Sequence, residues 1–136
     1  VVLPDFHFPT KEARNSLPKQ VDIKDAVHNI GRAVLVTEAF RTGDLGLLGE
    51  AMRDQLHQPY RLKLIPGADS AMEAAREAGA AAVALSGAGP SLIAFSSKIE
   101  TGLAESMKRA FQSAGLNARS FALTVCNDGA VVQTKE

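Results

Sequence analysis

Apolar residues recur at helical spacing along much of the chain. The clearest run follows Asp22, where the spacing alternates between four and three residues: Ile23, Val27, Ile30 and Val34. This is the period of an amphipathic helix. Shorter runs, each bounded by proline, glycine or a capping residue, predict four further helices, over residues 11–16, 45–52, 70–78 and 103–114.

Three local signals set the expected helix ends. Thr10 stands before the first helix, where a hydroxyl can cap the backbone. Pro59 is expected to limit the helix over 45–52, because proline cannot continue a helix. Ser70 and Glu73 have the spacing of a capping box at the start of the next helix.

Short apolar runs at other positions predict strands. They are residues 1–3, closed by a proline, then 82–85 and 92–95, and a run in which Phe121, Leu123 and Val125 alternate with smaller or polar residues. Asn127-Asp128-Gly129 reads as a turn, and residues 131–132 as a further short strand. The order of elements separates helices from a small antiparallel sheet, which predicts an α+β fold.

Composition narrows the class of protein. The length of 136 residues suits a single domain with its own core, residues 1–136. Fifteen basic residues balance fifteen acidic ones, so nucleic acid and acidic membrane surfaces are not expected partners. The one cysteine, Cys126, cannot form an internal disulfide and is expected to pack in the last strand. We expect a soluble protein of a reducing compartment, the cytoplasm, with no membrane-spanning segment.

A glycine-rich loop separates the two central strands: Ser86, Gly87, Ala88, Gly89, Pro90 and Ser91. Its glycines permit a tight turn or the close approach of a phosphate. The loop leads into a strand, without the lysine or third glycine of common nucleotide-binding loops. The residues alone therefore favour a hairpin connection and leave a phosphate site open.

Two arginines are candidates for binding a carboxylate, because the guanidinium group matches its planar geometry. Arg14 lies in a short segment bounded by prolines, and Arg61 lies at the end of a helix. The residues alone favour a solvated surface charge at each position. Thr10 would cap a helix or offer its hydroxyl to a substrate, and capping is favoured.

Other chemistry is not indicated by the sequence. His7, His28 and His57 lack the paired spacing of a metal site and read as structural or surface residues, with His57, four positions from Arg61, the exception to watch. Asn29 and Arg32 could face a substrate, but the sequence does not fix their direction. We find no nucleophile and base pair, so no catalytic residue and no metal ligand is predicted.

Three motifs in order carry a family resemblance. LSGAGPS at 85–91, followed by Ala94-Phe95, resembles the third motif of the GHMP kinases, a family of small-molecule kinases. TKEAR at 10–14 and QPYR at 58–61, followed by LIPG at 64–67, resemble the homoserine kinase branch. The resemblance implies a ferredoxin-like carboxy-terminal domain, with Arg14, Arg61 and the neighbouring Thr10 at the homoserine site.

The resemblance also implies what this chain lacks. Val1 opens directly into a strand, and the family's amino-terminal half, with its phosphate loop, is expected to be missing. That half would be the partner domain and would hold most of ATP and Mg²⁺, with the Ser86–Ser91 loop supporting its phosphate loop. The chain alone is then expected to be inactive, and a homodimer stays open.

Other functions stay open beside this one. A free-standing amino-acid-binding regulatory module, a pure oligomerisation domain, or another GHMP kinase acting on a mevalonate derivative would suit the same residues.

Overall fold

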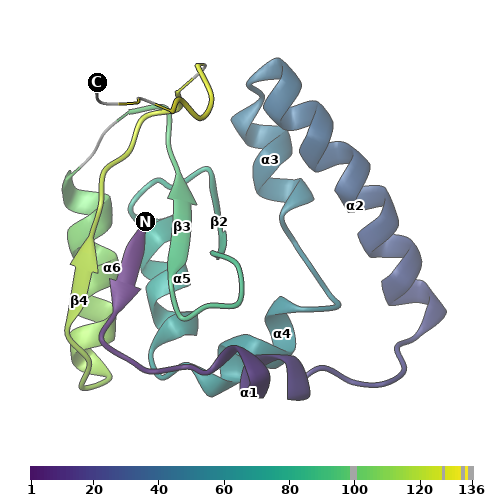
Figure 1. Ribbon diagram of the computed structural model, residues 1–136, viewed down its shortest axis with the longest axis horizontal. Helices are drawn as coiled ribbons and strands as arrows, with labels where there is room; N and C mark the ends of the chain where they lie inside the picture. The colour runs from purple at the N-terminus through teal and green to yellow at the C-terminus, as the bar shows by residue number, and fades with distance from the viewer. Residues whose placement is uncertain (99–100, 127, 133, 135–136) are drawn as a thin grey trace.

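The computed structural model describes residues 1–98, 101–126, 128–132 and 134. Its centre is a four-stranded antiparallel sheet (Figure 1), in the order β2-β3-β1-β4. The strands are β1 (Val2–Pro4), β2 (Ala82–Leu85), β3 (Leu92–Phe95) and β4 (Ala118–Ser120). Leu85 pairs with Leu92 across the hairpin, and Val2 lies between Leu92 and Ser120.

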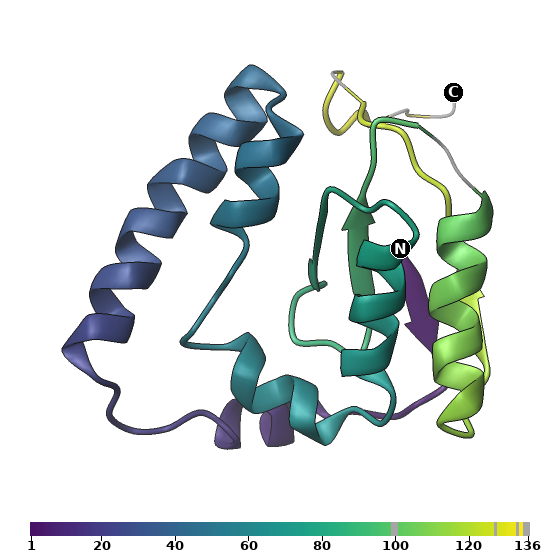
Figure 2. The same ribbon diagram turned by 180° about the vertical axis from the view of Figure 1, so that it is seen from behind.

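Two helices, α5 (Ala68–Glu77) and α6 (Thr101–Ser113), cover one face of the sheet, as Figure 2 shows from behind. Phe111, Met107, Leu92 and Val2 are almost fully buried between the layers. The order β1-α5-β2-β3-α6-β4 with this strand arrangement is a ferredoxin-like pattern. The expected α+β class is confirmed, and between β1 and α5 the chain inserts four further helices.

The insertion contains α1 (Thr10–Asn15), α2 (Ile23–Thr42), α3 (Leu45–Ala51) and α4 (Gln58–Arg61), followed by one 3₁₀ turn (Leu62–Leu64). Helices α2 and α3 form a hairpin beside the β2 edge of the sheet, whereas α1 and α4 lie together across one end (Figure 1). A Cβ at Gly49 would overlap the carbonyl oxygen of Ala81, so glycine lets α3 approach the start of β2 closely. None of the described helices is both long and apolar enough to cross a membrane.

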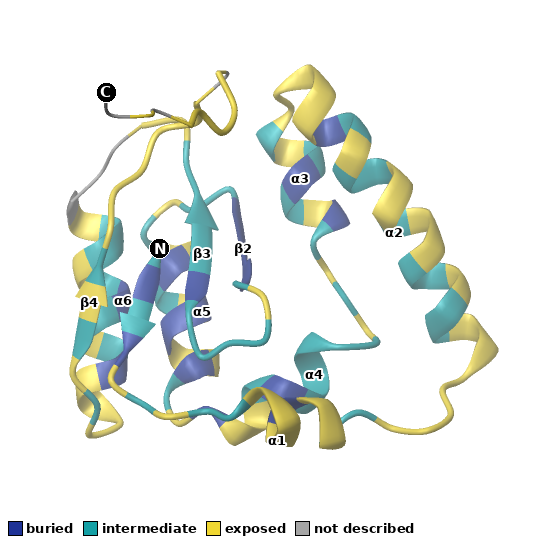
Figure 3. Ribbon diagram, viewed as in Figure 1, coloured by how far each residue is buried: buried dark blue, intermediate teal, exposed yellow. Residues whose placement is uncertain are grey.

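The apolar stripe of an amphipathic helix ordinarily packs against the rest of the protein, but the stripe of the long helix α2 does not. Its predicted bounds are confirmed, but the stripe from Ile23 to Val34 is exposed to solvent. The opposite face packs on α3 instead, through Val36 and the buried Ala39 (Figure 3). Spacing had indicated which residues share a face, but not which face meets the rest of the protein.

The last strand is earlier than predicted. It covers Ala118–Ser120 and pairs with β1, and Phe121 adds main-chain hydrogen bonds to Val1. Phe121, Leu123 and Val125 lie beyond it and are exposed. Cys126 is exposed too, so its expected packing in a strand is wrong.

The prediction of a short strand at 131–132 is also wrong, because the backbone of both valines is irregular and their side chains are exposed. The turn expected at 127–129 includes Asn127, which lies outside the described residues.

Several predicted helix ends are corrected. Pro9, not Thr10, is the N-cap of α1, and Thr10 is its exposed first residue without a capping hydrogen bond. Pro59 lies in the first turn of α4, where a missing N–H costs nothing, and α3 ends well before it. Helix α5 begins after Gly67, so Ser70 and Glu73 lie inside the helix and form no capping box.

Candidate functional site

Asp54 is the anchor of the segment that connects α3 to α4. Its carboxylate accepts hydrogen bonds from the side-chain amide of Asn29 on α2 and from the N–H groups of Leu56, His57 and Gln58. The side-chain oxygen of Asn29 accepts a further bond, 2.9 Å long, from the N–H of Gln55. These bonds fix the start of α4 relative to the middle of α2.

The environment shifts the pKa values of two groups of this segment, Asp54 and His57. Desolvation by itself would raise the pKa of Asp54, but the hydrogen bonds from Gln58, Asn29, His57 and Leu56 outweigh it and hold the pKa below its ordinary value. Partial burial lowers the pKa of His57, and the nearby charge of Arg61 lowers it further, with Asp54 opposing both. An ionised Asp54 therefore lies beside a His57 that favours its neutral form.

Gln58 links the same segment to the sheet. Its side-chain oxygen accepts a 2.8 Å hydrogen bond from the N–H of Leu85, the last residue of β2, and its amide nitrogen donates to the carbonyl of Met52 at 3.1 Å. The start of α4 is thus bonded to the strand that enters the glycine-rich loop.

Arg61 is the one charged residue with a buried side chain among the described residues, at 6% exposure. Its Nε donates a 3.0 Å hydrogen bond to the carbonyl oxygen of Ala13 in α1. Ala13 is the fully buried neighbour of Arg14, which is exposed. The structure therefore brings the side chain of one predicted arginine against the short helix that carries the other.

The glycine-rich loop closes the β2-β3 hairpin and packs onto the same corner. The N–H of Ser86 donates to the carbonyl of Ser91, and the N–H of Gly89 donates to the carbonyl of Ser86. A Cβ on Gly89 would lie 3.0 Å from Ile65, just beyond α4, and 3.7 Å from Phe8, just before α1. The predicted hairpin is confirmed, and its loop lies against the segments that flank both arginine-bearing helices.

These contacts test how the loop fits a phosphate. A phosphate cradle needs several free N–H groups on one side of a loop. Here the N–H groups of Ser86 and Gly89 are used within the hairpin, and Pro90 has none. Two of the N–H groups of the loop are therefore unavailable to a phosphate.

A cavity of about 300 Å³ lies where α2, the 51–58 segment and the end of β2 meet. Its lining includes the polar residues Asn29, Arg32, Asp54, His57 and Gln58. Asn29 and Arg32 thus face inward, which the sequence left undecided. A larger cavity, about 660 Å³, lies between α3, α5 and β2 and contains none of the predicted site residues.

The other two histidines, His28 and His7, do not line the smaller cavity. His28 bonds the carbonyl of Arg53 at 2.8 Å and has a structural role, and His7 is exposed beside the two phenylalanines that flank it. Within the described residues, no three histidine, cysteine or acidic side chains gather as metal ligands.

Sequence reasoning missed Asp54. The local signal was present, because an aspartate shortly before a proline-started helix commonly accepts the first free N–H groups of that helix. Its bond to Asn29 has no local signal, since the two residues are 25 positions apart.

Comparison with known proteins gives the family. Residues 36–117 match the model described as "GHMP kinases C terminal". The chain belongs to the GHMP kinase family. This match spans α3 to α5, the glycine-rich hairpin and α6, so it includes Arg61 and the Ser86–Ser91 loop.

Several curated relatives of this GHMP kinase domain are homoserine kinases. The homoserine kinase of Moorella thermoacetica is 48% identical over 97% of this chain and 45% of its own length. The homoserine kinase of Aquifex aeolicus is 42% identical over 96% of this chain and 44% of its own. The chain spans less than half the length of these relatives.

A solved structure supports the fold. The crystal structure of homoserine kinase from Cytophaga hutchinsonii superimposes with a TM-score of 0.83 at 34% identity, and covers 87% of this chain and 38% of its own.

Proposed function

We propose that this chain is the carboxy-terminal domain of a homoserine kinase, residues 1–136, and that it supplies the groups that bind the amino acid. The whole enzyme would transfer the γ-phosphoryl group of ATP to the hydroxyl of L-homoserine, on the way to threonine. The observation that carries the proposal is the buried Arg61, bonded to the main chain of α1 next to Arg14. The names of the relatives support the substrate.

The geometry of Arg61 suits a carboxylate. Its bond to Ala13 uses Nε alone, which leaves the two terminal nitrogens to form parallel charge-assisted hydrogen bonds. The bond also fixes the orientation of the guanidinium plane before any ligand arrives, which lowers the entropic cost of binding. Arg14, exposed on the adjoining helix, would complete the pair, and Thr10 at the start of that helix would offer its hydroxyl to the substrate.

The rest of the active site would come from an amino-terminal half. We place ATP and Mg²⁺ mainly there, as the family resemblance implies. In phosphoryl transfer the protein mainly positions the reactants and stabilises charge, so this domain would need to supply no base. The hairpin loop from Ser86 to Ser91 would support the phosphate loop of that half, which agrees with the bonds that the N–H groups of Ser86 and Gly89 form within the hairpin.

The proposed reaction also bears on where the enzyme works. Its substrates, ATP and an amino acid, place the enzyme in the cytoplasm, and the free Cys126 is compatible with a reducing compartment. We also propose that the enzyme is a homodimer.

A chimera tests the proposal. This chain would replace the matching segment of the Moorella thermoacetica enzyme, and formation of phosphohomoserine from ATP would be measured. We expect activity from the chimera and none from this chain alone. A folded chimera that phosphorylates no homoserine would contradict the proposal, as would tight amino acid binding by a chain that supports no kinase activity, the result expected of a regulatory module.

Arg14→Leu in that chimera tests the carboxylate site. Loss of a charge-assisted hydrogen bond costs about 1.5–3 kcal/mol, or roughly a 10- to 100-fold higher KM for homoserine, with kcat little changed. Arg14 is the better position to vary, because Arg61 is also bonded to Ala13. Arg119→Leu, at an exposed position in β4, is the matched control. Equal KM values for the two variants would remove Arg14 from the site.

A further inference from the structure

Strand β1 is shorter than the two segments that lie on either side of it in the sheet. It occupies the place between β3 and β4, and among the described residues its ladder with β3 holds one pair, Val2 with Leu92. Past Val1, residues 93–98 continue on one side and residues 121–125 on the other (Figure 1). The two neighbours of a central strand therefore run on beyond its first residue.

A cavity of about 420 Å³ lies where these two segments face each other. Its lining is largely apolar and consists of residues 93–98 and 121–125, Val1 and Val2, and three residues of α6, Leu103, Ala104 and Met107. The cavity is thus in line with β1, has strand segments on both sides and lies over α6. Neighbouring strands lie about 4.8 Å apart, so two segments separated by one strand position leave room for one extended chain.

The register of the β1-β4 ladder shows where such a chain would pair. Val1 and Phe121 exchange two main-chain hydrogen bonds, of 2.9 and 2.8 Å, and the N–H of Asp5 donates to the carbonyl of Asn117 at 2.7 Å. In an antiparallel ladder such bonded pairs recur at every second residue. The next bonded pair would therefore join Leu123 to the second residue upstream of Val1.

Residues 121–125 have the pattern of a strand without the regular backbone of one. Phe121, Leu123 and Val125 alternate with smaller or polar residues, and their exposed fractions are 46%, 71% and 89%. Single exposed apolar residues are ordinary, but three at strand period along the border of one apolar cavity indicate a surface that is covered in the whole protein. A ladder partner on the β1 side would give this segment regular strand structure.

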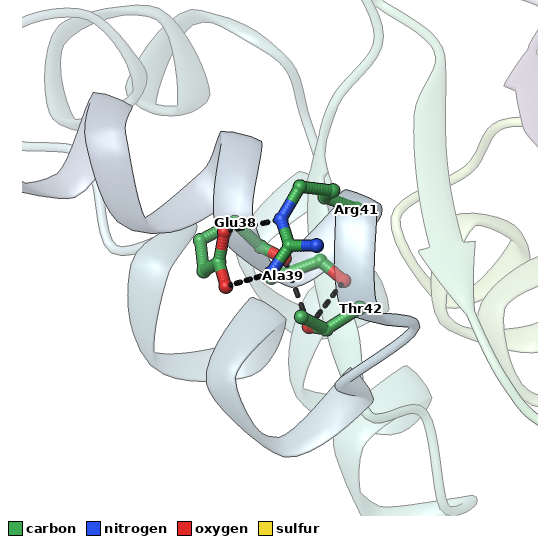
Figure 4. A network of polar contacts seen from close by, with 4 residues as sticks. All are labelled: Glu38, Ala39, Arg41 and Thr42. Carbon is green, nitrogen blue, oxygen red and sulfur yellow. Dashed lines mark hydrogen bonds and ion pairs between the residues drawn. The ribbon is translucent and has the colours of Figure 1, made fainter.

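The wall of the cavity at Phe95 is already formed in this chain. The ring of Phe40, near the end of α2, meets the ring of Phe95 edge on, with the centroids 5.6 Å apart. The turn that follows Phe40 is tied down, because Nε and Nη2 of Arg41 bond the two carboxylate oxygens of Glu38 at 2.8 and 2.7 Å (Figure 4). The hydroxyl of Thr42 donates to the carbonyl of Glu38 at 2.8 Å. The last turn of α2 thus holds Phe95 from outside the sheet.

The occupant of the cavity must lie in line with β1, because its path between β3 and residues 121–125 leads directly to Val1. A strand from any other source would have to end against Val1, whereas the residue that precedes Val1 in a longer chain is covalently joined to it. The curated relatives are more than twice as long as the segment that they share with this chain. We therefore propose that, in the whole enzyme, the residues just upstream of Val1 extend β1 through this cavity and pair with both β3 and residues 121–125. This inference rests on the proposed function, since it needs an amino-terminal half.

The register also gives the chemistry of this upstream segment. Its last residue, directly before Val1, would lie between Ala94 and Ala122 and point, like Val2, towards the core and α6. The residue before that would lie between Phe95 and Leu123 on the opposite face. Apolar side chains border both positions, so we expect an extended run of apolar residues, as in a strand that is buried on both faces.

Amide hydrogen exchange, followed residue by residue by NMR, tests the pairing in the chimera described above. The N–H groups of Leu123 and Val125 would be bonded to the upstream segment, whereas those of Ala122 and Thr124 would point to the open edge of the sheet. We expect the first two to exchange at least about tenfold more slowly than the other two, because a bonded N–H exchanges only on local opening. Equal exchange at the four positions would overturn the proposal.

Disulfide formation tests which segment fills the cavity. In the chimera with its other cysteines, including Cys126, replaced by serine, a cysteine placed directly before Val1 should bond to Ala122→Cys on mild oxidation. The two positions would form a non-hydrogen-bonded pair with Cα atoms about 4.5 Å apart, which suits a disulfide. Leu123→Cys with the same upstream cysteine is the matched control. It should form no disulfide, because its side chain would lie on the other face of the sheet.

The outcomes separate the alternative occupants of the cavity. A disulfide to Ala122→Cys within one molecule supports the proposal. A disulfide between two molecules would show that a second copy supplies the strand, and equal yields from the two variants would show that no fixed register exists. Either result refutes the proposal, as does the absence of any disulfide. Neither measurement needs kinase activity, so a chimera that phosphorylates no homoserine can still form the bond, and the two proposals can fail separately.

Discussion

Replacing Asp54 by alanine should loosen the joint between α2 and α4. The carboxylate accepts one hydrogen bond from Asn29 on α2 and three from successive N–H groups at the start of α4. Alanine keeps the main chain and removes all four acceptor contacts. The joint also positions His57 and Gln58, so its loss would act on the helix that ends at Arg61.

The magnitude follows from the number of bonds and their exposure. Loss of a helix-capping carboxylate costs about 0.5–2 kcal/mol, and one more side-chain hydrogen bond adds about 1 kcal/mol. The site is only partly buried, so water replaces some of the lost bonds and the larger values for buried charged groups do not apply. We expect the free energy of unfolding to fall by about 1.5–3 kcal/mol, and the melting temperature by roughly 10 °C.

Urea unfolding followed by circular dichroism at pH 7 measures this loss. Asp44→Ala is the matched control, since Asp44 is exposed and accepts a single 2.9 Å hydrogen bond, from the N–H of Leu47. That variant should lose about 1 kcal/mol or less. If the two variants lose equal stability, Asp54 is an ordinary cap and does not join the two helices.

The effect should also depend on pH. Despite desolvation, which acts to raise it, hydrogen bonding holds the pKa of Asp54 below its ordinary value. Such a carboxyl adds stability above its unfolded-state pKa of about 4, and this stability is lost as the pH falls towards the folded-state pKa. The difference between wild type and Asp54→Ala should thus be complete at pH 7 and shrink below about pH 4. A difference that stays constant on acidification would refute the assignment.

Two further predictions concern the same corner of the molecule. Burial and the charge of Arg61 lower the pKa of His57, so the unfolded chain takes up a proton first as the pH falls below about 6.5, and stability should decline from there towards the folded-state pKa. His57→Gln should remove that decline, and an unchanged pH profile of urea unfolding would contradict it. Gly89→Ala should cost more stability than Gly87→Ala: both have positive φ, worth about 1–2 kcal/mol for an alanine, but only at Gly89 would the new Cβ crowd Ile65 and Leu85. Equal losses in urea unfolding would show that the loop does not pack against that corner as described.

Local sequence patterns were sufficient to predict most of the helices and strands. The period of α2, the glycine and aspartate that separate α2 from α3, and the two apolar runs around the glycine-rich loop all act through neighbours in the chain. Helix ends were less well predicted, because Thr10, Ser70 and Pro59 each fit more than one helix position. The last strand was misplaced because alternation continues through Phe121 to Val125, whereas pairing with β1 stops near Phe121.

The candidate site was predicted in part. The sequence alone determined the arginines as candidates and the loop as a turn, since residue type and spacing carry that information. Only the tertiary structure decided that Arg61 reaches Ala13, that Asp54 holds Asn29, and that the stripe of α2 faces outward. The physical reason is that periodicity fixes the relative orientation of side chains within one helix, whereas the surface that each face meets depends on contacts between residues far apart in the chain.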